Sequence, residues 1–246
     1  MAALKRVMWP TVWMLAALAL MLGLGAWQMQ RKAWKEGLIA RIEARVKAEP
    51  VSLDEAIWQL QSTGDIEYLR VRVRGTFRHD KEMNLYAPEG GSGWQIFTPM
   101  QVPHLGALIV DRGFVPDAFR APESRKAGLI AGETEVIGLA RVPGVKGAFV
   151  PPNEPAKNIW YWRDLQAMLA AEQGAVRGGD RPWVPFFLDA QAEPANPGGW
   201  PKGGTTLVSL PNRHLEYAVT WYGLALALLG VYAVFVRGRL KDKPED

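Results

Sequence analysis

A histidine stands at the start of the last apolar segment of the chain, and imidazole can bind a metal or move a proton. It is His214, one of only three histidines in 246 residues. With Ala218, Trp221 and Ala225 it forms a stripe at i, i+4, i+7 and i+11 of a predicted helix. The small residues would let a flat macrocycle approach the backbone, and imidazole is a common axial ligand of haem iron. The stripe therefore permits haem ligation, with an interfacial histidine that holds no cofactor as the alternative.

The rest of the sequence contains no motif of a common enzyme class, such as Gly-x-Ser-x-Gly, a Walker loop or His-Glu-x-x-His. It contains no cysteine to act as nucleophile, metal ligand or disulfide partner. Residues 79–82, HDKE, offer three possible ligands, but their adjacency fits no usual metal site and predicts a solvated turn. Arg70, Arg72 and Arg74 form a basic strand face without the interleaved aromatic residues of a nucleic-acid platform. We therefore expect neither catalysis nor a nucleic-acid partner.

Two uncharged apolar segments are long enough to cross a bilayer. They are Val7–Gln30, with 24 residues, and Tyr217–Val236, with 20. A hydrocarbon core of about 30 Å needs about 20 helical residues. A cleaved signal peptide and a buried core helix are the respective alternatives. The predicted organisation is a cytoplasmic N-terminus over 1–6, membrane helices over 7–30 and 213–236, an outer α+β domain over 31–212 and a cytoplasmic tail over 237–246.

The outer domain is predicted to begin with a helical continuation of the first span over 31–48, which Pro50 ends. Ser52 and Glu55 then form a capping box for a short helix that runs to about Gln61. Period-two alternation begins at Ile66, and strand-like runs follow, separated by glycine and proline. These runs cover 68–77, 81–87, 93–102, 106–115, 133–142, 183–190 and 205–210, with one helix over 163–173. The fold class is a membrane protein with two transmembrane helices that flank an α+β domain built mainly on an antiparallel β-barrel or sandwich.

If both spans cross the membrane, their helices are antiparallel, and the end of the first lies level with the start of the second. Trp27 and Arg31 are then level with His214 and Trp221. Arg31 could pair with a carboxylate such as a haem propionate, or it could contact lipid phosphate. We further expect Asn212 to cap the second helix.

Small residues at helical spacing predict close packing of the two spans. The expected contact places one row against another: Ala19, Gly23 and Ala26 on the first helix, and Gly223, Ala227 and Gly230 on the second.

Taken in order, six segments resemble the Surfeit locus protein family. They are LGAWQMQRKAWKEGLIARIEARV, VRGTFRHDKEM, VDRGFVP, FVPPNEPAKNIWYWRDLQAMLA, PFFLDA and GGWPKGGTTLVSLPNRHLEYAVTWYGLALA. The resemblance covers nearly the whole chain and includes both predicted spans at their places. It implies a membrane assembly factor of cytochrome c oxidase, not an enzyme, that aids delivery or insertion of haem a into the catalytic subunit.

The resemblance also implies where the function lies. The histidine of NRHL, here His214, is the suspected ligand of haem iron. Trp27 and Arg31 of WQMQR and Tyr222 of TWYG match family positions, and Trp221 completes the expected haem a site. The implied partners are subunit I of cytochrome c oxidase, haem a synthase and the lipid bilayer. The implied location is the bacterial inner (plasma) membrane, as a multi-pass protein with both termini cytoplasmic and a periplasmic domain. A cofactor-free scaffold that stabilises an oxidase subunit is the alternative function.

Overall fold

The structure, a computed structural model, describes residues 2–88, 92–173, 183–206 and 211–241. It consists of two compact units. One contains Met1–Arg41 and Ser209–Asp246, and the other contains Ile42–Val208.

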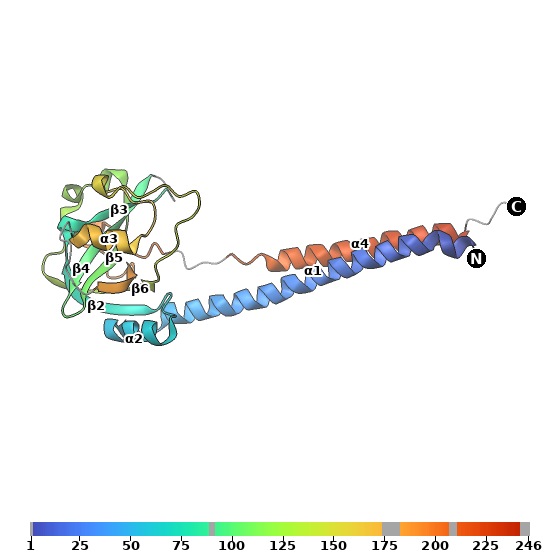
Figure 1. Cartoon of the computed structure of the whole chain (residues 1–246), viewed down its shortest axis with the longest axis horizontal. Coiled ribbons are helices and arrows are strands. Elements are labelled where there is room, and N and C mark those ends of the chain that lie inside the picture. Colours follow the sequence, from blue (N-terminus) through green and yellow to red (C-terminus); the bar gives the residue numbers. More distant parts are fainter. Residues whose placement is uncertain (1, 89–91, 174–182, 207–210, 242–246) are drawn as a thin grey trace. The chain divides into compact units, whose positions relative to one another are not determined.

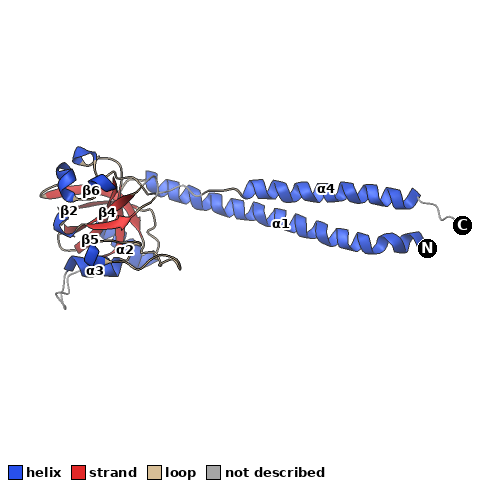
Figure 2. Ribbon diagram, turned by 90° about the horizontal axis from the view of Figure 1, so that it is seen from above, coloured by secondary structure: helices blue, strands red, loops and turns tan. Residues whose placement is uncertain are grey.

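The first unit is a pair of long helices. Helix α1 spans Ala2–Lys47 and helix α4 spans His214–Lys241. They lie side by side and antiparallel, with both chain ends at the same end of the pair (Figures 1 and 2). Both are long and apolar enough to cross a membrane, with mean hydropathy of 1.9 and 2.0 over their most apolar windows. The predicted helical continuation over 31–48 is confirmed, because α1 runs without interruption to Lys47.

The second unit is built on a seven-stranded sheet. Its strands are β1 (Val51–Ser52), β2 (Arg70–Phe77), β3 (Met83–Tyr86), β4 (Gly93–Val102), β5 (Gly106–Pro116), β6 (Glu133–Arg141) and β7 (Trp183–Ala190). The strand order is β1-β2-β6-β7-β5-β4-β3, and an additional pairing of β2 with β4 closes five of the strands into a barrel. The pairs are antiparallel except β1–β2 and β5–β7, which are parallel. The prediction of a barrel or sandwich is thus resolved as a closed barrel.

Two short helices accompany the barrel, as predicted. Helix α2 (Leu53–Thr63) begins after Ser52, whose hydroxyl accepts a hydrogen bond from the Glu55 amide at 3.2 Å. Helix α3 (Leu165–Gln173) packs through Leu165 and Met168 against the outside of β5 and β7. The expected strand over 205–210 is wrong at Thr205 and Thr206, which have no strand structure, and its remaining residues lie outside the described ranges.

The barrel interior is filled by the alternate residues that the period-two pattern predicts. Val71, Val73 and Phe77 of β2 are buried, whereas Arg72 and Arg74 between them are exposed. This confirms the basic outer face of β2. Arg74 Nε donates to Glu135 Oε2 at 2.9 Å, so part of that face is paired with a neighbouring strand.

Two consecutive charged side chains of β5 point to opposite faces of the sheet, because neighbouring side chains of a strand alternate. Asp111 and Arg112 are 3% and 1% exposed, and each belongs to a different ionic cluster. Gly113 follows with φ of +113°, and a Cβ there would lie 1.8 Å from the Lys202 carbonyl oxygen. Only glycine allows the Phe114 amide and carbonyl to pair with Lys202, which holds this end of β5 in place.

Candidate functional site at one end of the helix pair

The two long helices meet along a regular seam. On α4, the least exposed residues recur at steps of three and four, from His214 through Ala218, Trp221 and Ala225 to Leu228, Tyr232 and Phe235. The matching set on α1 is Thr11, Met14, Leu18, Met21, Gly25, Gln28, Lys32 and Lys35. A repeat of seven residues with two contact positions is the packing pattern of a left-handed helix pair. The predicted stripe of His214, Ala218, Trp221 and Ala225 is therefore the contact face of α4.

His214 meets a polar partner on this seam. Its Nδ1 lies 2.7 Å from Gln28 Oε1. Because an amide oxygen can only accept, Nδ1 is the donor of this contact, and in the neutral imidazole Nε2 then carries the lone pair that binds metals. Gln28 thus gives His214 the form of a metal ligand, as second partners of ligating histidines commonly do.

Sequence reasoning missed Gln28, although a signal for it exists. The residue lies three positions after Gly25 and four before Lys32, so it continues the heptad of α1. The expected row of small residues on α1, Ala19, Gly23 and Ala26, defines a different face of the helix, which does not include Gln28.

The contacts around this end of the pair fix its register. Lys35 donates from its ammonium group to the carbonyl of Pro211, and the Tyr222 ring lies against Gly25. A Cβ at position 25 would be 2.6 Å from Tyr222 Cε1, so this close approach requires glycine. Toward the other end, the hydroxyls of Thr11 and Tyr232 share a hydrogen bond.

The predicted site residues divide into two groups. His214, Trp221 and Tyr222 lie on α4 along or beside the seam, together with Gly25 and Gln28 of α1. Trp27 and Arg31 are exposed and lie outside the seam positions of α1. The guanidinium of Arg31 stacks over the ring of Trp34, with 3.9 Å between Cζ and the ring centroid. The level placement of the two helix ends is confirmed by the Gln28–His214 contact.

Two expectations about this unit are wrong. The small residues Gly23, Gly223 and Gly230 do not mediate helix packing, because a Cβ at any of them would meet no atom within 4 Å. Ala19, Ala26 and Ala227 are likewise exposed. The heptad of the seam replaces these rows, with Gly25, Ala218 and Ala225 as its buried small residues.

The second error concerns the start of α4. Asn212 was expected to cap this helix, but its buried Oδ1 accepts no hydrogen bond in the described part of the chain. The helix begins at His214, and its Tyr217 amide bonds back to the Arg213 carbonyl at 3.4 Å. The capping position therefore falls on Arg213, one residue later than expected.

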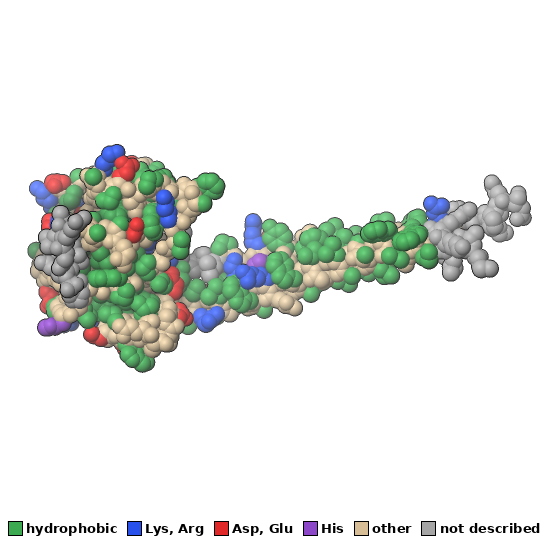
Figure 3. Space-filling model, in the orientation of Figure 1, with side chains coloured by type: hydrophobic (Ala, Val, Ile, Leu, Met, Phe, Trp, Pro, Cys, Tyr) green, Lys and Arg blue, Asp and Glu red, His purple; other side chains and the backbone are tan. Residues whose placement is uncertain are grey.

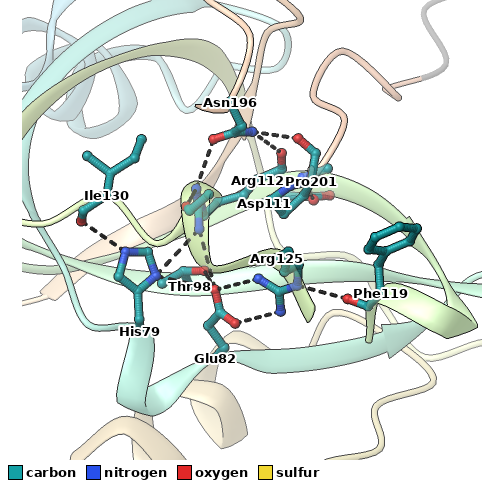
Figure 4. A network of polar contacts seen from close by, with 12 residues as sticks. His79, Glu82, Thr98, Asp111, Arg112, Phe119, Arg125, Ile130, Asn196 and Pro201 are labelled. Atoms are coloured by element: carbon teal, nitrogen blue, oxygen red, sulfur yellow. Dashed lines mark hydrogen bonds and ion pairs between the residues drawn. The ribbon is translucent and has the colours of Figure 1, made fainter. Parts of the chain in front are cut away.

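The barrel contains a buried ionic cluster formed by Glu82, Arg112 and Arg125 (Figure 4). Glu82 Oε2 accepts from Arg125 Nη2 at 2.7 Å, and Glu82 Oε1 lies 3.4 Å from Arg112 Nη1. The expectation of a solvated turn over 79–82 is wrong for Glu82, which is 8% exposed. Burial alone would raise the pKa of Glu82, but the bonds from His79 and Arg125 and the two guanidinium charges outweigh it and lower this pKa to about 2.

Another ionic cluster contains Asp111, Asp189 and Arg163. Arg163 donates to Asp111 Oδ2 at 2.7 Å and to Asp189 Oδ1 at 2.8 Å, so two buried carboxylates share one guanidinium. Arg141 adds a longer contact to Asp189 at 3.4 Å. Burial raises the pKa of Asp111 to about 7, and the charge of Asp189 adds to this effect while Arg163 opposes it.

Neither barrel cluster has the composition of a metal site. In the described ranges, no group of three or more His, Cys, Asp or Glu side chains is placed to hold a metal ion. The acidic groups of both clusters are instead bonded to arginines. The helix pair differs, because a haem iron needs only one or two axial ligands from the protein and His214 presents one suitable nitrogen. The donor set of the pair thus fits a haem.

Comparison with known proteins identifies the family. A model of the SURF1 family matches residues 15–226. The chain is 41% identical to human Surfeit locus protein 1 over 235 residues, which cover 88% of this chain and 74% of the human protein. Mouse Surfeit locus protein 1 is 40% identical over 222 residues, 83% of this chain and 68% of the mouse protein. The SURF1-like protein of Monosiga brevicollis is 38% identical over 229 residues, covering 87% and 82%.

The family model runs through the barrel, most of α1 and the first part of α4, and it agrees with the six segments noted in the sequence. The chain therefore belongs to the SURF1 family, which is known for assembly factors of cytochrome c oxidase.

Proposed function

We propose that this protein is a membrane-anchored assembly factor that aids the delivery of haem a to the catalytic subunit of cytochrome c oxidase. Haem a is the cargo in this proposal, and subunit I of the oxidase receives it. The single observation that carries the proposal is the His214–Gln28 contact, which engages Nδ1 and leaves Nε2 without a hydrogen bond among the described residues. The protein makes and breaks no covalent bond of its cargo.

Membrane anchoring is supported by the surface of the helix pair. Large apolar side chains along it are exposed, among them Trp13 at 71% and Leu226 and Val234 at 72%. Figure 3 shows this face as mostly hydrophobic between lysine and arginine side chains that lie near both ends of the pair. Exposed apolar surface of this length is stable in lipid and unfavourable in water. We propose a bacterial inner membrane with both termini cytoplasmic and the barrel in the periplasm.

In the proposed site, Nε2 of His214 ligates the haem iron. Trp221 and Tyr222 lie about two helical turns after His214 on α4, and Trp27 offers an exposed indole on α1 for contact with the apolar ring. Arg31 moves from the Trp34 ring and pairs with a propionate of the haem. It thereby exchanges a weak cation–π contact for a charge-assisted hydrogen bond. Bound haem would supply the iron that the oxidase needs, while the protein keeps it in place.

Delivery of haem a to the oxidase subunit requires that this protein bind the haem reversibly. One axial histidine, an exposed arginine and exposed aromatic rings give a site that is open on one side. Such a site binds through few strong contacts, so a subunit with a more enclosed pocket and a second ligand can take the haem. Haem a synthase, a partner that the family resemblance implies, is the proposed donor.

The experiment is to purify the full chain from cells that make haem a, and separately from cells that lack haem a synthase. We expect a haem a absorption spectrum only in the first preparation, with subunit I recovered from both. Recovery of subunit I without any haem a spectrum in the first preparation would contradict the carrier role. That result would instead support a cofactor-free scaffold.

The scaffold is favoured by one observation, the exposed basic face of β2. Arg72 and Arg74 are exposed, whereas Arg70 is half-buried and donates to Gln191 Oε1 at 2.9 Å. If the scaffold function is correct, replacing Arg72 and Arg74 with glutamine will abolish recovery of subunit I. If only haem delivery matters, the same replacements will leave the haem a spectrum unchanged.

A further inference from the structure

A cavity of about 310 Å³ opens on the barrel beside the Glu82 cluster. Apolar side chains of Phe77, Val136 and Ile137 form part of its wall, and the segment 190–197 forms another part. Arg112 also lines it. At about 30 Å³ for each water-sized unit, the cavity holds a molecule of about ten non-hydrogen atoms. It is therefore much too small for a haem and is separate from the proposed haem site.

Most of the Arg112 guanidinium already contacts other groups of the protein. Nη2 donates to the Gly128 carbonyl and, at 2.8 Å, to Asn196 Oδ1, while Nη1 lies 3.4 Å from Glu82 Oε1. Its Cζ is 4.7 Å from the centroid of the Phe77 ring. In the described part of the chain, however, the buried Nε has no hydrogen-bond partner. A buried donor without an acceptor is costly, so this position calls for an acceptor.

The charges of the cluster point to the kind of acceptor. Arg112 and Arg125 bring two buried positive charges, and Glu82 brings one negative charge. Burial lowers the pKa of Arg112 to about 10, which leaves it cationic at neutral pH. The cluster therefore carries at least one uncompensated positive charge beside the cavity, and buried charges are normally paired.

The acidic residues on the cavity wall limit the charge of the ligand. Glu135 is paired with Arg72 and Arg74. Glu193 is exposed. These two carboxylates disfavour a second negative charge on the ligand at the cavity mouth, and the apolar wall disfavours a strongly polar one.

We propose that this cavity is a binding site for a small monocarboxylate with a short apolar chain. The carboxylate accepts from Arg112 Nε and balances the excess charge, and the apolar chain lies against Phe77, Val136 and Ile137. The site is independent of the haem proposal, because none of its residues belongs to the helix pair.

The test uses the full chain in lipid nanodiscs with ¹⁵N-labelled arginine. Butyrate is the probe, and butyramide is its uncharged counterpart of the same size. The Arg112 Nε–H resonance is assigned by its loss in Arg112→Lys. We expect butyrate to shift this resonance with a saturating curve and a Kd of about 1 mM or less, and butyramide to leave it unmoved.

The variant Ala195→Trp is the control, because Ala195 is an exposed residue of the cavity wall and a bulky ring there fills the cavity without touching the buried cluster. We expect it to abolish the butyrate shift. If Arg112→Lys does not fold, the wild type is compared with Ala195→Trp directly. An arginine Nε–H resonance that butyrate shifts to saturation in the wild type, and does not shift in Ala195→Trp, then supports the site. No saturating shift, or the same shift in Ala195→Trp, overturns the proposal.

Discussion

The helix pair and the barrel use polar side chains in opposite ways. In the barrel, buried charges bond to each other: Glu82 to two arginines, and Arg163 to two aspartates. In the helix pair, the seam is mostly apolar, and in the described part of the chain His214 makes one side-chain hydrogen bond, through Nδ1. The difference indicates that the barrel clusters stabilise the fold, and in the proposed function Nε2 of His214 is the atom that binds a ligand. Variants in one region should therefore leave the property of the other region unchanged.

The largest expected effect is on the stability of the barrel, from Glu82→Gln. Removing this carboxylate leaves the charges of Arg112 and Arg125 buried without a counterion. We expect a loss of about 3–5 kcal/mol in the free energy of unfolding. Urea titration of the full chain in detergent, followed by tryptophan fluorescence, measures it.

Glu135→Gln is the matched control, because Glu135 pairs with two arginines at a partly exposed position. A loss of at most about 1 kcal/mol is expected there. Equal losses in the two variants would show that the buried cluster has no special role in stability.

The next effect concerns the packing of the helix pair. Gly25→Ala places a methyl group against the Tyr222 ring, and we expect it to weaken the pair by about 1–3 kcal/mol. The absence of cysteine in the chain allows a direct measurement, the yield of a disulfide between Thr11→Cys and Tyr232→Cys. Gly23→Ala is the control, since a Cβ there meets nothing within 4 Å. A lower yield in Gly23→Ala than in Gly25→Ala would refute the register of the seam.

The two barrel clusters should respond to pH with opposite signs. The pKa of Asp111 is raised from 3.8 to about 7, so the native state binds more protons and stability from this group falls as pH rises from about 4 to 7. The pKa of Glu82 is lowered from 4.5 to about 2, so its contribution is present above pH 4.5 and is lost as pH falls toward 2. We expect Asp111→Asn to flatten the fall in unfolding free energy between pH 4 and 7. If the free energy of unfolding of this variant falls with pH as steeply as that of the wild type, Asp111 is not the group that binds the extra proton in the native state.

The smallest expected effect is from Arg31→Gln on haem retention. Arg31 is exposed, and an exposed pair with a propionate contributes about 0.2–1 kcal/mol, or up to ~5-fold in affinity. Arg41→Gln, also exposed on α1, is the control. Haem a content after a detergent wash measures both variants, and barrel stability should not change in either. Equal retention in Arg31→Gln and the wild type would remove the propionate contact from the account.

Much of the fold follows from local sequence patterns. Strand β2 was predictable because Val71, Val73 and Phe77 alternate with polar residues, and α2 because Ser52 and Glu55 mark its start. The closure of the barrel was not predictable in this way. It depends on the pairing of Thr76 and Phe77 with Gln101 and Met100, which are distant in sequence and carry no local signal.

The candidate site was predictable only in part. The spacing of His214, Trp221 and Ala225 placed them on one face of α4, since one helix carries all of that information. Their contact with α1 was not predicted, because the sequence favoured a contact through Gly223, Ala227 and Gly230. The partner Gln28 depends on the register between two helices, which a single sequence does not specify. The burial of Glu82 was missed for a related reason, because Arg112 and Arg125 reach it from other segments of the chain.

The central claim is that His214 ligates the iron of haem a through its free nitrogen. The most direct measurement is the absorption spectrum and haem a content of purified His214→Ala, compared with His104→Ala, which replaces an exposed histidine of the barrel. The account predicts that His214→Ala loses the haem a spectrum while its barrel unfolds at the wild-type urea concentration, and that His104→Ala keeps both properties. Wild-type haem a content and an unshifted spectrum in His214→Ala would contradict it.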